Sequence, residues 1–222
     1  MEKERKKTSR YVFLQAFLLA FLLFNFGIFL GYKLETSRAN IIGDLYIISE
    51  LGSFDAKIQT ELFGLGEIDC DSLVKENLAF ADRVFGESLL LAKYDNAKRI
   101  SESIKLQHKR YDLLRTLIWV NSIKISKNCE NSPHRVVYIY SYEDRNLDVL
   151  SKQKVFSTAL GDLKTKHGDE IMLIPIAGDN EISSLNMLMN QYGIDKLPSI
   201  IINENIKVTE VEDINNLEQY LE

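Results

Sequence analysis

One uncharged apolar segment near the N-terminus constrains this chain more than any other feature. It covers residues 12–31, and Gln15 and Asn25 are its strongly polar side chains. Because a helix rises about 1.5 Å per residue, a helix of this length covers roughly the 30 Å hydrocarbon core of a bilayer. A helix also pairs its backbone groups internally, as a membrane span requires. We therefore predict one transmembrane helix over residues 11–32.

The charges around this segment predict its orientation. Residues 1–10 carry five Lys or Arg against two Glu, whereas the residues just after the span are balanced in charge. Lys and Arg favour the cytoplasmic side of a membrane. We expect a basic cytoplasmic tail over residues 1–10 and a single-pass plasma-membrane protein whose later residues lie outside the cytoplasm. The alternative is a cleaved signal peptide, although the apolar run is long for one and no small-residue cleavage site follows it.

The charge of the remaining chain bears on its partners. Of 27 Lys and Arg, 22 follow the span, and of 32 Asp and Glu, 30 follow it, so this part carries about eight net negative charges. Nucleic-acid binding needs a basic face that displaces counterions from phosphates. We therefore exclude nucleic acid as a partner and expect the membrane together with a protein client or a sister membrane protein.

Residues 33–130 show the periodicity of an all-α region outside the cytoplasm. Apolar residues recur three or four positions apart, as in amphipathic helices, over residues 34–63, 71–91 and 96–126. In the first helix these positions are Ile41, Leu45, Ile48, Leu51, Phe54 or Asp55, Ile58 and Leu62. Gly43 and Gly52 weaken that helix, so packing must hold it. Residues 64–69 end it, and a short link at 94–97 makes the next two helices antiparallel.

The two cysteines of the chain are Cys70 and Cys129. In an antiparallel pair of helices, the start of the second predicted helix lies beside the end of the third, where these cysteines are placed. Bridged cysteines need Cα atoms within about 7 Å, and an extracytoplasmic compartment permits disulfides. We predict a disulfide between them. The alternative is two unrelated, partly buried thiols.

After a polar connector at residues 127–133, the helical periodicity gives way to short blocks. β-branched and aromatic runs predict strands, and longer mixed segments predict helices. The predicted strands are 135–142, 171–177, 198–203 and 206–211, and the predicted helices are 147–167, 182–192 and 213–221. The order βαβαββα indicates a small α/β sheet with parallel members and a terminal hairpin around Glu204 and Asn205.

This order of elements, together with residues 192–202, resembles the thioredoxin superfamily. In that family a Tyr-Gly-Ile/Val segment leads to a cis-proline and the third strand, and the matching positions are Tyr192, Gly193, Ile194, Leu197 and Pro198. The resemblance covers residues 135–222 and implies a thioredoxin-like domain there. It also implies that Leu197 and Pro198 line a groove for an extended peptide. The alternative is that Pro198 simply begins an ordinary strand.

The chain departs from the family at the family's reactive site. Thioredoxins place Cys-x-x-Cys between the first strand and the first helix, but residues 141–150 contain no cysteine. Depending on the gap chosen, the sulfur positions hold Asp144 and Leu147, or Asn146 and Val149. None of these side chains can form a thiolate or a mixed disulfide. The buried acid of the family's first strand is also replaced, near Tyr138. The layout is similar to that of membrane-anchored thioredoxin-like proteins of archaea, most of which keep the cysteines.

Other chemistry finds little support in the sequence. The three histidines, His108, His134 and His167, have no second ligand at helical spacing, so we predict no metal site. No phosphate-binding glycine loop occurs, and we predict no cofactor. The acidic residues within 143–148 have two interpretations: they form a weak cation site, or they cap the start of a helix.

These observations leave three functional hypotheses. The first, which we favour, is a non-catalytic binding, chaperone or assembly module without catalytic residues, because peptide capture needs only backbone pairing and a groove. The second is a thiol-disulfide oxidoreductase that works through Cys70 and Cys129, which requires an accessible and strained bridge. The third is a structural protein whose long first helix forms a coiled-coil stalk.

Overall fold

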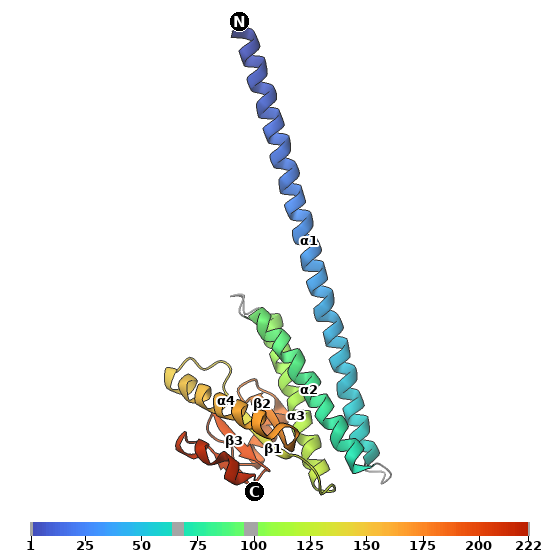
Figure 1. The fold of residues 1–222 in the computed structure, drawn as a ribbon, viewed down its shortest axis with the longest axis vertical. Helices are drawn as coiled ribbons and strands as arrows, with labels where there is room; N and C mark the ends of the chain where they lie inside the picture. Colours follow the sequence, from blue (N-terminus) through green and yellow to red (C-terminus); the bar gives the residue numbers. More distant parts are fainter. Residues whose placement is uncertain (1, 64–68, 96–101, 222) are drawn as a thin grey trace. The chain divides into compact units, whose positions relative to one another are not determined.

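The computed structural model of this chain describes residues 2–63, 69–95 and 102–221 (Figure 1). Its helices and strands are α1 (Glu2–Phe63), α2 (Cys70–Asp95), α3 (Glu102–Ser126), β1 (His134–Tyr140), α4 (Leu147–His167), η1 (Gly168–Glu170), β2 (Ile171–Ala177), α5 (Ser183–Gln191), β3 (Ser199–Ile202), β4 (Ile206–Val208) and η2 (Glu212–Tyr220). The chain divides into two compact units, Met1–Glu50 and Leu51–Glu222. The links predicted at 64–69 and 94–97 lie largely outside the described residues.

The first unit consists of the N-terminal part of α1. Its Arg10–Thr36 segment is long and apolar enough to cross a membrane, and its large apolar side chains are exposed. The Asn25 amide donates to the Phe21 carbonyl at 2.7 Å, and the Thr36 hydroxyl donates to the Tyr32 carbonyl at 2.9 Å. Such bonds to the preceding turn lower the cost of placing polar groups in an apolar medium.

Within residues 102–221 the second unit contains a mixed four-stranded sheet of order β2-β1-β3-β4. β1 pairs with β2 in parallel, and the antiparallel pairs are β1 with β3 and β3 with β4. The parallel pair requires a crossover connection, which α4 provides. The predicted order of strands and helices is confirmed. The main differences are that β1 ends at Tyr140 and β4 at Val208, each before its predicted end, and that the closing element, η2, is a 3-10 helix.

Side chains of β1 alternate between two apolar layers. Val136 and Tyr138 face the side covered by α4 and η2. Val137 and Ile139 face the other side, where α5, α3 and α2 pack. α5 spans nine residues, so the longer α2 and α3 supply much of the cover on that side. Full burial of each large apolar side chain contributes about 1.5–3 kcal/mol.

The hydrophobic core crosses the predicted boundary between residues 130 and 135. One cluster contains Phe80 of α2, Ile118 and Trp119 of α3, and Val137 and Ile139 of β1. Without α2 and α3 the sheet would expose a contiguous apolar face, which soluble proteins avoid. The helices after Leu51 and the sheet therefore form one unit, where the sequence predicted two separate regions.

The end of α1 packs on this unit through small residues. Ala56 is buried, and its carbonyl accepts a hydrogen bond from the Asn121 amide of α3 at 3.4 Å. A Cβ atom added to Gly52 would lie 3.4 Å from the Phe80 ring. The apolar positions predicted from periodicity lie elsewhere on the helix and are exposed, at Leu51, Phe54, Ile58 and Leu62. Packing therefore uses a different face of α1 from its apolar stripe.

A buried charge pair ties the β3–β4 hairpin to β1, and an indole hydrogen bond ties it to α3. Asn203 and Glu204 both have positive φ, 49° and 61°, as tight hairpin turns require. The Glu204 carboxylate accepts hydrogen bonds from Arg135 Nε at 2.8 Å and from Trp119 Nε1 at 3.0 Å. The Arg135 and Glu204 side chains are 10% and 12% exposed. The hairpin is therefore tied both to β1 and to α3.

The structure contains the predicted disulfide between Cys70 and Cys129, whose Cα atoms are 5.6 Å apart. Cys70 begins α2, and Cys129 follows the end of α3. Leu73 and Ile125 pack beside the bridge in a small apolar cluster. The antiparallel arrangement of these helices thus brings the cysteines together, as the sequence predicted.

We predict that Glu204→Gln lowers the free energy of unfolding by about 3 kcal/mol, because it leaves the buried Arg135 charge without a counter-charge. The matched control is Glu210→Gln, whose partner Lys152 lies 3.2 Å away at the surface. That change should cost less than about 1 kcal/mol. Urea unfolding of the full chain in detergent micelles measures both values, and equal losses would contradict the prediction.

Candidate functional site

Three segments meet at the edge of the sheet where β1 and β2 end. β1 and β2 are parallel, so the loops that follow them, residues 141–146 and 178–182, leave from the same edge. β3 is antiparallel to β1, so its start, after Pro198, lies at this edge too. We call these three segments the carboxyl-edge site. It contains the position at which the sequence resemblance places a dithiol.

Asp179 holds the loop after β1. Its carboxylate accepts hydrogen bonds from the Ser141 hydroxyl at 2.5 Å and from the backbone N–H groups of Tyr142 and Glu143, both at 2.9 Å. Burial raises the pKa of Asp179, but the hydrogen bonds from Ser141, Tyr142 and Glu143 outweigh burial and leave that pKa below its ordinary value of 3.8. Asp179 is therefore ionised at neutral pH and fixes the loop backbone.

The first turns of α4 complete the loop with polar caps. The Asn146 side chain accepts the N–H of Asp148 at 2.9 Å, and Asp144 accepts the N–H of Asn146 at 2.8 Å. The Gln153 side chain accepts the N–H of Ser141 at 2.7 Å. Leu147 is 77% exposed. The positions considered for sulfur thus hold helix-capping groups and an exposed apolar side chain.

α3 lies against the outer side of this loop. The His108 and Tyr142 rings are 4.3 Å apart, and Lys105 Nζ lies 2.5 Å from the Glu143 carboxylate. Both charged side chains of that pair are about half exposed, so the pair itself contributes little to stability. The contacts nevertheless show that α3 covers part of the edge.

A buried acid at this edge comes from α3, not from the first strand. Asp112 is 1% exposed and accepts hydrogen bonds from the Ala177 N–H at 3.2 Å and the Asn180 amide at 2.5 Å. Burial raises the pKa of Asp112, and the nearby Arg115 partly offsets this rise. Burial, followed by the Asp112 charge, raises the pKa of Tyr140 to about 12. The sequence analysis did not identify Asp112. The available signal was Arg115, which follows it by three positions and pairs with it on the same helix.

The residues predicted to line a peptide groove lie at the same edge. The Leu197–Pro198 peptide bond is cis. Pro198 is buried and Leu197 is half-buried against the core. A Cβ atom on Gly178 would come within 2.8 Å of Ile139 and 3.1 Å of Leu197. Glycine at 178 is therefore what lets the second and third segments approach each other.

The disulfide lies far from this edge. His108, near the start of α3, contacts the loop, whereas Cys129 follows the end of that helix. The 18 residue steps from His108 to the last residue of α3, Ser126, span roughly 27 Å of helix. Cys129 is 4% exposed. The sulfur atoms of this chain therefore cannot take part in chemistry at the carboxyl edge.

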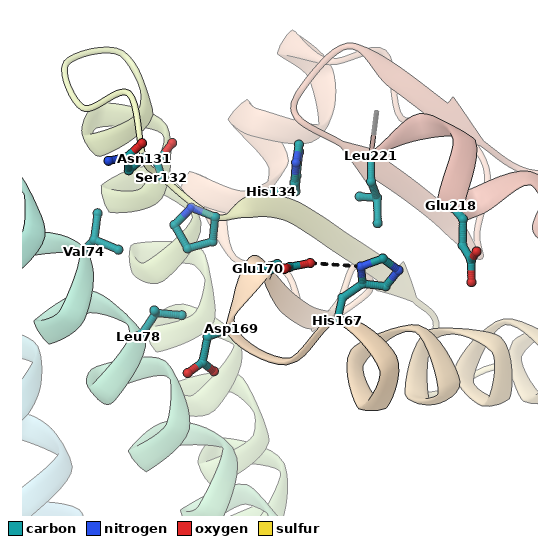
Figure 2. A pocket seen from close by; sticks show the side chains of 11 residues that line it. Val74, Leu78, Asn131, Ser132, His134, His167, Asp169, Glu170, Glu218 and Leu221 are labelled. Atoms are coloured by element: carbon teal, nitrogen blue, oxygen red, sulfur yellow. Dashed lines mark hydrogen bonds and ion pairs between the residues drawn. The ribbon is translucent and has the colours of Figure 1, made fainter.

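A cavity of about 490 Å³ lies at the opposite edge, where β1 and β2 begin (Figure 2). It is lined by Val74, Leu78, Asn131, Ser132, Pro133, His134, His167, Asp169, Glu170, Glu218 and Leu221. His167 Nδ1 lies 3.3 Å from the Glu170 carboxylate, while its buried Nε2 has no hydrogen-bond partner. Among the described residues, no group of three or more His, Cys, Asp or Glu is arranged to hold a metal ion.

Another cavity, of about 570 Å³, lies beside α4. It is lined by Phe85, Tyr138, Tyr140, Leu150, Gln153, Lys154, Ser157, Leu160, Gly161, Leu173 and Pro175. Its walls are mostly apolar, and Leu150 stands three residues after the exposed Leu147. An apolar surface therefore runs from the carboxyl edge along α4. We call Leu147, Leu150 and this cavity the α4 groove.

Comparison with known proteins gives weak likenesses. The chain matches no family model, and no curated protein sequence is similar to it. A solved malarial protein is 18% identical over 40% of this chain and 94% of its own, with a TM-score of 0.32. The germline-specific thioredoxin Deadhead from Drosophila melanogaster is 13% identical over 47% of this chain and 94% of its own, with a TM-score of 0.33. Likenesses of this size do not define a family for the chain.

We predict that Asp179→Asn destabilises the protein by about 1–3 kcal/mol at pH 7, because the loop loses a charged acceptor. A carboxyl whose pKa is lowered on folding stabilises the fold above its unfolded pKa, here near 3.8, and that contribution is lost as the pH falls through the folded value. The difference between wild type and variant should thus shrink at pH 3. Thermal melts of the full chain at both pH values measure it, with Asp195→Asn as a surface control. A difference independent of pH would contradict the assignment.

Proposed function

We propose that this protein is a membrane-anchored, thioredoxin-like binding module without dithiol chemistry. One observation carries the proposal: the loop at which a dithiol would stand contains no cysteine, and it is fixed by hydrogen bonds to Asp179 and by contact with α3. The order of strands and helices after residue 134, and the residues that match the thioredoxin pattern around Leu197 and Pro198, support the fold assignment.

We propose that the apolar part of α1 anchors the protein in the plasma membrane with the N-terminus in the cytoplasm. The basic tail over residues 1–10 supports this orientation. The disulfide between Cys70 and Cys129 supports an extracytoplasmic location for the second unit, because disulfides persist in oxidising compartments.

The proposed client is an apolar segment of another protein. By resemblance to the thioredoxin family, its contact at Leu197 and Pro198 is through the backbone, because the Pro198 side chain is buried and the Leu197 side chain packs against the core. The α4 groove adds exposed apolar surface to the site, since Leu147 is 77% exposed and Phe85 is 53% exposed. Binding of this kind needs a groove and apolar side chains, and no reactive group.

A thiol-disulfide oxidoreductase is the competing function. It would have to use Cys70 and Cys129, but Cys129 is 4% exposed and packs with Leu73 and Ile125. Cys70 is partly buried beside it. A packed structural bridge is hard to reduce, whereas catalytic bridges are exposed or strained. The surroundings of the bridge therefore favour a structural role.

We predict that the full chain in nanodiscs does not catalyse disulfide reduction beyond the rate of a Cys70→Ala/Cys129→Ala variant. The bridge should also have a reduction potential below about −300 mV, as structural disulfides do. Insulin reduction with dithiothreitol measures the first quantity, and equilibration with glutathione and dithiothreitol buffers measures the second. Turnover that depends on these two cysteines would overturn the proposal.

Binding itself is tested with a permanently unfolded protein, reduced and carboxymethylated α-lactalbumin. We expect Leu147→Gln in the nanodisc-embedded chain to weaken its binding by about threefold to tenfold, because an exposed apolar contact is lost. Met187→Gln, at a 72% exposed position on α5, is the control. Fluorescence anisotropy gives both affinities. Failure of the wild type to bind, or equal loss in both variants, would contradict the proposed groove.

A further inference from the structure

The part of α1 that follows Glu50 has an exposed apolar stripe. The stripe residues are Leu51, Phe54, Ile58 and Leu62, which are 63%, 55%, 57% and 44% exposed. At about 100° per residue, these positions fall within an arc of roughly 80° on the helix. A stripe this narrow is the form of a helix-pairing seam, since helices that pack on a globular core show a wider apolar face.

The stripe does not supply the buried residue through which α1 packs onto the rest of the second unit. That contact uses Gly52 and Ala56, which lie on a different side of the helix. Small residues thus face the core while large apolar residues face outward. Single exposed apolar side chains are ordinary, but aligned ones indicate an interaction surface.

We propose that this stripe is the interface between two copies of this chain, paired in parallel. Each copy carries the stripe at the same place along the chain, with Leu51 following Thr36, the last residue of the apolar segment, by 15 positions. Two copies anchored by the same segment therefore present the stripe on the same side of the membrane. A surface that meets its own copy in this way forms a closed, twofold interface.

The area of the stripe sets the strength of the pairing. Burying the exposed parts of these side chains removes roughly 100 Å² each, or about 800 Å² for a pair, less than the roughly 1,200 Å² of a stable soluble complex. Anchoring in one membrane raises the effective concentration of the copies and offsets this shortfall. The pairing is therefore a property of the membrane-bound chain and weakens when detergent dilutes the copies.

The test uses the full chain, labelled at its C-terminus with donor or acceptor and reconstituted into liposomes at several protein-to-lipid ratios. We expect energy transfer that rises with protein density and falls when unlabelled copies are added. Ile58→Gln should weaken this association at least about tenfold, because each pair loses two apolar contacts. Leu106→Gln, at a 69% exposed position on α3, is the matched control and should leave it unchanged.

Cysteine cross-linking maps the interface independently. Leu51→Cys and Ile58→Cys should form disulfide-linked dimers rapidly under mild oxidation, whereas Lys57→Cys, which projects beside the stripe, should react several-fold more slowly. Absence of energy transfer at every density, or cross-linking without preference for stripe positions, would overturn the proposal.

The proposal rests on membrane anchoring but not on client binding. Carbonate extraction of the liposomes reports anchoring separately, so a failure of insertion is distinguished from a failure of pairing.

Discussion

The packing of α3 against one face of the sheet is the contact on which the rest of the second unit depends. Val137 and Ile139 of β1 need apolar cover on that face, and the nine-residue α5 is too short to supply it alone. Once α3 lies there, its polar side chains reach the strand ends on both sides of the sheet, at the carboxyl edge and at the β3–β4 hairpin. Asp112 binds the end of β2, and Trp119 binds the hairpin through Glu204.

The same contact decides which chemistry the proposed binding module could perform. The start of α3 lies on the loop after β1, where the resemblance would place reactive sulfurs, and the end of α3 leads to the disulfide. The helix thus separates the cysteines from the carboxyl edge by most of its length. What remains at that edge is a capped loop, a buried acid and an adjoining apolar groove. Such a surface can hold a partner but has no thiol with which to exchange electrons.

The sequence predicted the elements well where the signal is local. β2 matches its predicted range because its residues form one apolar, β-branched block, and α4 matches because Asn146 caps its start and Gly168 follows its end. The disulfide could be predicted because two antiparallel helices place Cys70 and Cys129 at the same end of the pair. Asp112 and Asp179 were not predicted as site residues, because the partners that place them at the carboxyl edge lie 36 to 68 positions away. The packing face of α1 was missed because Gly52 and Ala56 carry no periodic apolar signal. The connector at 127–133 marks a change of element type, which does not reveal where a core ends.

Hydrogen exchange of the full chain in nanodiscs tests most directly whether α3 and the sheet form one cooperative unit. If they do, the backbone amides of α3 around Trp119 and those of β1 open together and show equal free energies of opening. The contrary result is α3 exchanging through its own, much easier opening while β1 stays protected. That outcome would mean that the helix can leave the sheet and that the carboxyl edge is covered only part of the time.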